Sequence, residues 1–340
     1  MEIPIPDRKI RAAYKIYRDS SPLNKSNSDF KQDRWISSQQ VEFLDFTLLI
    51  QKVFHSKYLN NLVDISAGDF DNLAPALESM IQSQLVSIGM DGELIYHGKK
   101  KELAINQNQG ITWDEPTNQL NQFPCSRESI VKRYNFLQER YALYEKVSIG
   151  LFGDDDLLSL LLDSNNTFST SVYEYDERIT KYILNNTKHT KVKQCNLTEE
   201  QGVCDITHDT FLIDPPYTFH GALCFILAGL KTLRKDTQSE FYVILNRMIC
   251  GKMLPELLKH LAIAEIHVES IHENFNQYDL PKGYTETANA SNFLAQHNTD
   301  TKSLIRSSSS NLYIFRTKEP NIKYLSKLLK TEFIYNHYQW

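Results

Sequence analysis

Three short apolar segments between residues 146 and 218, each followed at once by acidic residues, constrain the fold of this chain most. A nucleoside-binding α/β sheet begins with a strand, a tight turn at a glycine and then a helix, and KVSIGLFGDDDLLSLLL has this order. The acidic residues that end the three segments are Asp154, Asp155 and Asp156, then Glu174 and Asp176, then Asp214. Because open α/β sheets bind ligands at the carboxyl ends of their strands, we expect these side chains to line one site.

Strand-like and helix-like segments alternate from residue 146 to 318, which predicts a single α/β domain with a mostly parallel sheet. Ser126 is expected to cap a helix over 127–144 that precedes the first strand. The expected strands are Val147–Leu151, Ser171–Tyr175, Thr210–Ile213, Phe241–Leu245, Ile263–Ser270 and Leu312–Arg316.

The segment from Asn274 to Ser310 lies between the last two expected strands and is rich in Asn, Thr and Ser. We interpret it as a long mobile loop that serves as a lid at the carboxyl edge of the sheet, with FNQY at 275–278 closing over the site. Residues 319–340 have an apolar stripe and are predicted to form an amphipathic C-terminal helix that packs on the body of the protein.

Residues 1–36 are polar and are interpreted as an N-terminal arm, and residues 101–145 as a linker followed by a helix. Between them, residues 37–100 contain two helical segments (one over 38–54, one over 70–84) and then two short strands joined at Asp91-Gly92. This order resembles a winged helix, which either reads DNA or packs on another protein. We favour packing, and a homodimer, because the helix FDNLAPALESMIQSQ has no Lys or Arg to neutralise phosphates.

Bulk composition disfavours several classes of partner. The net charge of -5 gives no global field toward nucleic acid or anionic lipid, and no apolar run is long enough to span a bilayer. The segment MEIPIPDRKIRAAYK lacks the apolar core of a signal peptide. Five cysteines, an odd number with no C-x-x-C pair, are typical of a reduced cytoplasmic chain. We therefore expect a cytoplasmic protein with no nucleic-acid and no membrane partner.

The acidic triplet after the first strand predicts more than a helix cap. One carboxylate is enough to cap a helix, whereas three in succession repel one another and raise at least one pKa. Such a cluster suits a cationic ligand, a metal, or a reaction that needs a carboxylate base. Metal is the weakest of these, because the chain has no Gly-rich phosphate loop with Lys and its His and Cys residues lack zinc-site spacing. We therefore expect no metal.

The other two acidic clusters predict contacts with hydroxyl groups and with an amine. Glu174 lies about twenty residues after the first turn, where such sheets place a carboxylate on ribose hydroxyls. Asp176 is interpreted as a helix cap and salt-bridge residue, with ligand binding as a second possibility. In Asp214-Pro-Pro-Tyr217 two prolines fix the backbone, so that Asp214 can accept from an amine and Tyr217 can stack on a flat or cationic group. His220 either reaches the same ligand or lies in solvent.

Several motifs in a consistent order resemble the branched-chain polyamine synthases, that is, the N4-bis(aminopropyl)spermidine synthases. They are NQFPCSRES at 121–129, GDDDLLS at 153–159, VYEYDER at 172–178, DPPYTFHG at 214–221 and FILAGLKTL at 225–233. GDDD together with DPP is the specific part of this signature. The resemblance implies a Rossmann-like sheet of the class I methyltransferase type, preceded by an N-terminal winged-helix-like domain.

The resemblance also implies an activity, namely transfer of the aminopropyl group of decarboxylated S-adenosylmethionine to an amine, with release of methylthioadenosine. On this interpretation Asp154 takes the proton of the amine, Asp155 or Asp156 pairs with the ammonium group of the donor, and Glu174 holds the ribose. The residues that the resemblance assigns to donor binding are Gly150, Gly153, Asp155, Glu174, Asp176 and Asn196, and those it assigns to the acceptor are Asp214, Pro215, Tyr217 and His220.

The acceptor is less closely specified than the donor. The resemblance implies that Asp214 and the Pro215 carbonyl orient the acceptor amine. This chain has Tyr217 where the family has a glutamate, and Cys195-Asn196 where the family has His-Asp at the adenine. The amide oxygen of Asn196 still accepts from an adenine amino group. The acceptor is therefore expected to be a polyamine, or an amine carried on a peptide or nucleotide natural product.

Two other functions are weighed against this one. DPPY also ends a strand in amino-methyltransferases of the adenine-N6 class, where the aspartate accepts from the target amine and the tyrosine stacks on a flipped base. The acidic triplet and the missing F-x-G-x-G turn disfavour this class. The third function is a transcriptional regulator with an inactive nucleoside domain, which the three acidic clusters disfavour.

Overall fold

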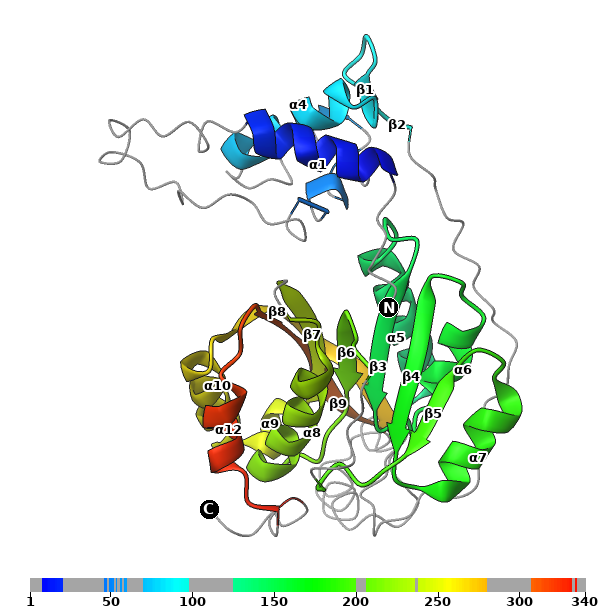
Figure 1. Cartoon of the computed structure of the whole chain (residues 1–340), viewed down its shortest axis with the longest axis vertical. Coiled ribbons are helices and arrows are strands. Elements are labelled where there is room, and N and C mark those ends of the chain that lie inside the picture. Colours follow the sequence, from blue (N-terminus) through cyan, green and yellow to red (C-terminus); the bar gives the residue numbers. More distant parts are fainter. Residues whose placement is uncertain are drawn as a thin grey trace, which may run out of the picture. The chain divides into compact units, whose positions relative to one another are not determined.

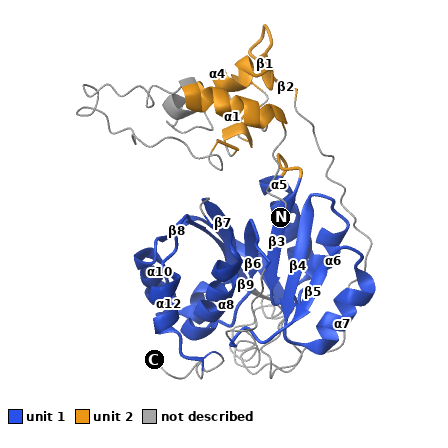
Figure 2. Ribbon diagram, in the orientation of Figure 1, with its two compact units in different colours: residues 1–4, 103–141, 146–340 blue, residues 5–102, 142–145 orange. Residues whose placement is uncertain are grey.

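The computed structural model describes residues 8–20, nine positions between 46 and 59, residues 70–97, 125–199, 206–235, 238–279 and 307–331, and residue 334. The chain divides into two compact units, which are coloured separately in Figure 2. One unit comprises residues 5–102 and 142–145, and the other comprises residues 1–4, 103–141 and 146–340. The finer domain boundaries expected from the sequence stay predictions.

The N-terminal unit contains helices α1 (Arg8–Ser20) and α4 (Phe70–Gln82) and an antiparallel hairpin of β1 (Val86–Ile88) and β2 (Leu94–Tyr96). The hairpin predicted at Asp91-Gly92 is confirmed. Part of the segment interpreted as an arm is helical, because α1 buries Ile10, Ala13 and Tyr17 at the spacing of one helix face. The winged-helix assignment stays a prediction, and most of the helix predicted over 38–54 lies outside the described residues.

The larger unit is built on a seven-stranded sheet in the order β5-β4-β3-β6-β7-β9-β8 (Figure 1). Neighbouring strands among the first five pair in parallel, and β9 is antiparallel to both of its neighbours. The predicted α/β class with a mostly parallel sheet is therefore confirmed. The strands are β3 (Val147–Phe152), β4 (Phe168–Glu174), β5 (Lys191–Gln194), β6 (Thr210–Ile213), β7 (Ser239–Leu245), β8 (Ile266–Asp279) and β9 (Ser307–Thr317).

Strand order reverses between β3 and β6, because the chain first runs outward through β4 and β5 and then returns to the other side of β3. Such a switch point is where open α/β sheets bind ligands, at the carboxyl ends of the strands. The acidic triplet follows β3 and Asp214 follows β6, so both border this point. The sequence did not predict β5, whose residues KVKQ are polar and partly exposed at the sheet edge.

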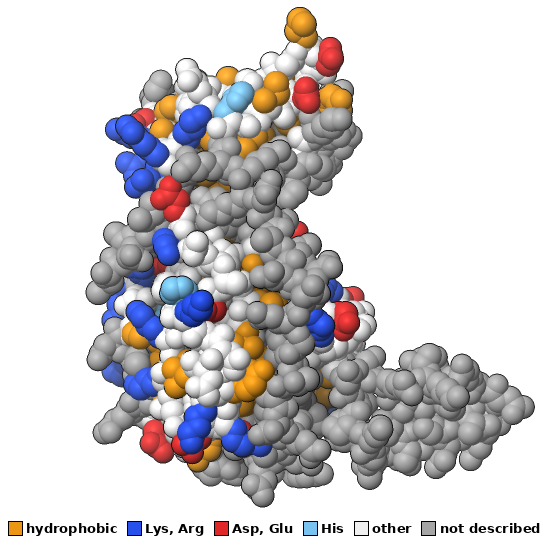
Figure 3. Space-filling model, turned by 90° about the vertical axis from the view of Figure 1, so that its right-hand side faces the viewer, with side chains coloured by type: hydrophobic (Ala, Val, Ile, Leu, Met, Phe, Trp, Pro, Cys, Tyr) orange, Lys and Arg blue, Asp and Glu red, His pale blue; other side chains and the backbone are white. Residues whose placement is uncertain are grey.

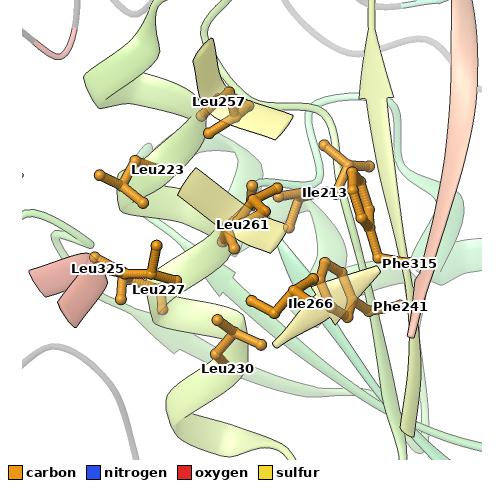
Figure 4. Close-up of a cluster of buried hydrophobic side chains, with 14 of the residues drawn as sticks. Ile213, Leu223, Leu227, Leu230, Phe241, Leu257, Leu261, Ile266, Phe315 and Leu325 are labelled. Carbon is orange, nitrogen blue, oxygen red and sulfur yellow. The ribbon is translucent and has the colours of Figure 1, made fainter. Parts of the chain in front are cut away.

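Helices cover both faces of the sheet. The helices are α5 (Arg127–Arg140), α6 (Leu158–Asp163), α7 (Glu177–Asn186), α8 (Phe219–Thr232), α9 (Arg247–Cys250), α10 (Met253–Ile263) and α12 (Ile322–Leu328). Figure 4 shows leucines of α8, α10 and α12 packed against Ile213, Phe241 and Phe315 of the sheet. This core is buried and apolar, and it fixes the strand ends that carry the acidic residues.

The loop predicted over 274–310 is the first of three predictions near the C-terminus that the structure corrects. The segment 274–310 is not a loop at its ends, because Asn276 pairs with Ser310 and Tyr278 with Ser308 in a continuation of β8 and β9. Its polar composition misled the prediction, since β8 is an edge strand and much of it faces solvent. Residues 280–306 lie outside the described residues.

The boundaries of two further elements differ from those predicted. Strand β8 begins at Ile266 and not at Ile263, because α10 continues to Ile263 and a left-handed Glu265 (φ 61°) then turns the chain. The C-terminal helix ends at Leu328, since Leu329 is extended, whereas it was predicted over 319–340. Among the described residues, no helix is long and apolar enough to cross a membrane.

Candidate active site at the carboxyl edge of the sheet

The turn after β3 presents the three aspartates before helix α6 begins. Gly153 adopts φ +77°, which favours glycine, and its N–H donates to the carbonyl of Tyr173 on the neighbouring strand at 2.9 Å. Leu157 is also left-handed, with φ 59°. Because α6 starts at Leu158, the aspartates occupy a turn aimed at the strand ends rather than the first turn of a helix.

Glu174 ties the ends of β3 and β4 together. Its Oε1 accepts from the N–H groups of Tyr175 and Asp176, each at 2.8 Å, and its Oε2 accepts from the N–H of Asp154 at 3.0 Å. A carboxylate offers about four lone-pair positions, so roughly one remains on Oε2 for a ligand. Burial raises the pKa of Glu174, although the three backbone N–H groups oppose this effect.

Asp154 is a buried acid with little compensation. Its Oδ2 accepts from the N–H of Ser159 at 3.2 Å, and its side chain is 3% exposed. Burial raises its pKa to about 8, the hydrogen bonds from Ser159 oppose this, and the charges of Asp156 and Glu174 add to it. With this pKa, Asp154 is mostly protonated at neutral pH.

Arg133 of α5 is a buried cation that the sequence analysis did not identify. Its Nη1 donates to Asp156 at 2.5 Å, its Nη2 to Asp214 at 2.7 Å, and its Nε to Asn276 at 2.9 Å. Asp156 also accepts from the N–H of Cys125, immediately before α5. Two of the five acidic side chains at this edge are thus already paired with a positive charge.

Strand β8 supplies the last wall of the site. A bulge between His272 and Asn276 changes which side chains of β8 point to which face of the sheet, and such bulges are common beside active sites. As a result Asn276 is fully buried and Tyr278 donates to Asp214 at 2.5 Å. Burial raises the pKa of Asp214 to about 6, Arg133 and Tyr278 lower it, and Asp156 adds to the increase.

Asp155 differs from its neighbours because it has no hydrogen-bond or ion-pair partner within the described part of the chain. Its side chain is half-buried at the mouth of the cluster. Burial and the charges of Asp156, Asp214 and Glu174 raise its pKa, and Arg133 opposes them. An unpaired carboxyl among other acids is the best-placed group here to attract a cation.

Tyr217 and the prolines before it also border the cluster. The hydroxyl of Tyr217 lies 3.4 Å from a carboxylate oxygen of Asp214 and 3.2 Å from the hydroxyl oxygen of Tyr278, and it can donate its single proton to one of them at a time. Pro215 and Pro216 are buried and follow Asp214 directly. The DPPY segment therefore forms part of the site wall.

Four of the predicted site residues have other partners in the structure. Gly150 lies in the middle of β3, where a Cβ atom would come within 2.9 Å of His208, and Asp176 caps α7 and pairs with Arg178. The Oδ1 of Asn196 already accepts twice from Thr198. The ring of His220 accepts from the N–H of Lys330, in the segment that follows α12. Among the described hydrogen bonds, Gly150, Asn196 and His220 have no contact with the acidic cluster, whereas the backbone N–H of Asp176 donates to Glu174 at 2.8 Å.

One sequence signal would have revealed Arg133. The buried face of α5 contains Ile130, Tyr134 and Leu137, and Arg133 has the same i, i+3, i+4, i+7 spacing. A cation on the buried face of a helix requires carboxylate partners, because an unpaired buried charge is too costly. Asn276 and Tyr278 lie in the FNQY segment at 275–278 that the sequence analysis expected to close over the site, and the structure places both beside Arg133 and Asp214 as part of strand β8.

The negative charge of the site is local. On the face shown in Figure 3, basic and acidic side chains are both visible, and the described residues seen there form no broad acidic patch. Within the described residues, no group of three His, Cys, Asp or Glu has the arrangement to hold a metal ion.

Comparison with known proteins assigns the family. Residues 105–337 match the family described as branched-chain polyamine synthase A, C-terminal domain. The chain belongs to this family. The resemblance inferred from GDDD and DPP is thereby confirmed.

Two curated relatives are N(4)-bis(aminopropyl)spermidine synthases from Thermococcus kodakarensis and Methanocaldococcus jannaschii. The first is 28% identical over 196 residues, 55% of each chain, and the second is 26% identical over 183 residues, 52% of each chain. The match thus spans about half the length of these relatives. A solved branched-chain polyamine synthase mutein from Thermus thermophilus shares the fold, with a TM-score of 0.50 and 17% identity over 92% of both chains. That protein was crystallised with N4-aminopropylspermidine and 5'-methylthioadenosine.

Proposed function

We propose that this protein is an aminopropyltransferase that moves the aminopropyl group of decarboxylated S-adenosylmethionine to an amine and releases methylthioadenosine. The observation that carries the proposal is the charge of the site. Among the described residues, five carboxyl groups gather around one cation, Arg133, at the switch point of the sheet. A donor that is both a sulfonium and an ammonium must meet a second cationic molecule there, and the surplus negative charge offsets their repulsion.

In the proposed reaction the lone pair of a neutral acceptor nitrogen attacks the carbon that is bonded to the sulfonium sulfur. The new N–C bond forms as the C–S bond breaks, and the electron pair of the C–S bond goes to sulfur, which becomes a neutral thioether. The nitrogen then carries one proton too many, which a carboxylate accepts and passes to solvent. No oxidant, reductant or metal is needed.

The site residues suit separate parts of this reaction. Asp155, which has no partner, pairs with the ammonium group of the donor, and the paired Asp156 does not. The remaining lone pair of Glu174 accepts from a ribose hydroxyl, and Asp154 takes the proton of the attacking amine. Asp214 orients this amine together with the Pro215 carbonyl. Asn196 contacts the adenine only if it gives up one of its bonds to Thr198.

The acceptor class follows from the same charges. An amine that is protonated in water must lose a proton in the site, so a linear polyamine with several amino groups is the first candidate. The Thermus relative was solved with a branched polyamine bound, N4-aminopropylspermidine. Because the phenol of Tyr217 adds no negative charge beside Asp214, an amine with fewer positive charges, on a peptide or nucleotide product, is the second candidate.

The test is to incubate the protein with decarboxylated S-adenosylmethionine and a panel of amines. Mass spectrometry is expected to show methylthioadenosine together with acceptors heavier by one or two aminopropyl groups. Intact S-adenosylmethionine should bind more weakly, because its additional carboxylate faces the acidic cluster. Preference for the intact cofactor, with methyl transfer to an amine, would instead establish the amino-methyltransferase class and refute the proposal.

A further inference from the structure

The guanidinium group of Arg133 joins three segments that are far apart in the sequence. It is 2% exposed and hydrogen-bonds to the turn after β3, to the end of β6 and to β8. Burial alone lowers the pKa of this group, but Asp156 and Asp214 outweigh burial and raise the pKa above its ordinary value. Arg133 is therefore a permanent positive charge inside an otherwise acidic cluster.

This charge divides the acids into two sets. Asp156 and Asp214 are paired with Arg133, whereas Asp154, Asp155 and Glu174 are not. The planar guanidinium spans the two paired carboxylates with different nitrogens, so it fixes both their charge and their orientation. Asn276 in turn receives Nε–H and sets the plane of the guanidinium.

Asp214 depends most on this arrangement, because it borders the acceptor side of the site. Without Arg133, its pKa would rise above about 6, since burial and Asp156 would act against fewer opposing groups. The titratable and charged groups that face Asp214 among the described residues are Cys125, which precedes α5, Arg133 from α5, Asp155 and Asp156 from the turn after β3, Tyr217 from its own segment, Cys250 from α9 and Tyr278 from β8.

We propose that Arg133 is a positioning residue that keeps Asp214 ionised and aimed at the acceptor amine, with Asn276 orienting the guanidinium. Arg133 itself does not touch substrate. This inference rests on the proposed function, because it assigns Asp214 to the acceptor. It predicts that the loss of Arg133 impairs use of the amine without impairing binding of the nucleoside.

The experiment compares Arg133→Met and Arg133→Lys with the wild type across pH 5 to 9. In Arg133→Met the acidic limb of kcat/KM for the amine is expected to move up by about one pH unit or more, and KM for the amine to rise at least tenfold. The Kd for methylthioadenosine should change less than threefold. Arg133→Lys keeps the positive charge but loses the planar guanidinium that donates to both carboxylates. The acidic limb of its kcat/KM profile should therefore shift less than in Arg133→Met, while its KM for the amine still rises.

Arg140→Met is the matched control, because Arg140 lies on the same helix and forms a similarly buried ion pair with Glu240. This variant should lose stability and leave the acidic limb where it is. Equal effects of Arg133→Met and Arg140→Met on the pH profile would overturn the proposal, as would an unchanged KM for the amine in Arg133→Met. If Arg133→Met does not fold, Asn276→Leu replaces it and should shift the limb in the same direction by a smaller amount.

A wild-type protein that transfers no aminopropyl group would refute the proposed function and not this inference. The ionisation of Asp214 would then be followed by hydrogen exchange of β6 peptides as a function of pH. The pH at which protection changes should be higher in Arg133→Met than in the wild type. If this pH is the same in the two proteins, the proposed role of Arg133 is refuted independently of the proposed function.

Discussion

Replacing Asp154 by asparagine should stabilise the larger unit, and increasingly so as the pH rises. In the native state the pKa of Asp154 is about 8, against an ordinary value of 3.8. The folded protein therefore holds this proton more tightly than the unfolded chain, and between these two values stability falls as the pH rises. At 1.36 kcal/mol per pH unit, ionisation of the unfolded chain costs the native state about 4 kcal/mol at pH 7.

Asp154→Asn removes this cost and keeps an oxygen to accept from the N–H of Ser159. Relative to wild type, the variant should gain about 4 kcal/mol between pH 4 and pH 7 and little more above pH 8. Because the chain has two compact units, unfolding of the whole chain mixes their transitions, so hydrogen exchange of β3 and β4 peptides is the better measurement. Glu177→Gln, which removes an exposed carboxylate on α7, is the control.

The reasoning fails if the difference between Asp154→Asn and the wild type is the same at pH 5 and pH 8, or if it shrinks as the pH rises. Activity provides an opposite expectation. If Asp154 takes the proton of the amine, the variant should lose about 100-fold or more in kcat, within the range of general base catalysis. A more stable but inactive variant would show that this acid is retained for chemistry at the expense of stability.

Three further changes have defined outcomes. Glu174→Gln should weaken methylthioadenosine binding about 10- to 100-fold by calorimetry. Its amide N–H₂ would face the backbone N–H of Asp154, and the site would lose the oxygen lone pair that is left to accept from the ribose. Gly229→Ala should cost about 1–3 kcal/mol in denaturant unfolding, since its Cβ would lie 2.5 Å from the Phe211 ring, whereas Gly89→Ala, with 3.6 Å to the nearest atom, is the control and should cost less. Burial lowers the pKa of His208 to about 4, so stability is lost as pH falls from 6.5 to 4, and His208→Gln should lack this loss of about 3 kcal/mol.

The sequence predicted the acidic half of the site because strand topology decides which residues meet. Carboxylates that directly follow parallel strands lie at one edge of the sheet, so the turn at Gly153, Glu174 and Asp214 needed only the correct strand pattern. The short edge strand β5 was missed because its mostly polar residues have no buried face and therefore show no alternation of apolar and polar positions.

The other half of the site depends on long-range packing, which local patterns do not encode. Arg133 lies on a helix before the first strand, and its partners are 23, 81 and 143 residues away. Tyr278 reaches Asp214 only because a bulge in β8 changes the facing of an edge strand whose sequence looks like a loop. The sequence pointed to the FNQY segment at 275–278, but the contact between Tyr278 and Asp214 follows only from the sheet order and the register of β8 with β9.

The pairing of the acids also bears on when a base becomes available. Asp154 has a pKa of about 8, so at pH 7 it is a neutral acid and a poor proton acceptor. A cation beside Asp155 would lower the pKa of both acids, so the donor itself would create the base that the acceptor needs. Binding of decarboxylated S-adenosylmethionine should therefore release protons, whereas binding of neutral methylthioadenosine should release few.

Calorimetry in buffers of different ionisation enthalpy measures this difference directly. Asp154→Asn should reduce the proton release on donor binding, and Glu177→Gln should not. Equal proton release with the donor and with methylthioadenosine would mean that the positive charge does not act on these acids. Asp156 and Asp214 are already paired with Arg133, so the released protons must come from the acids that Arg133 does not pair with, Asp154 and Asp155. Because the positive charge of the donor is what ionises these acids, the donor must bind before the amine.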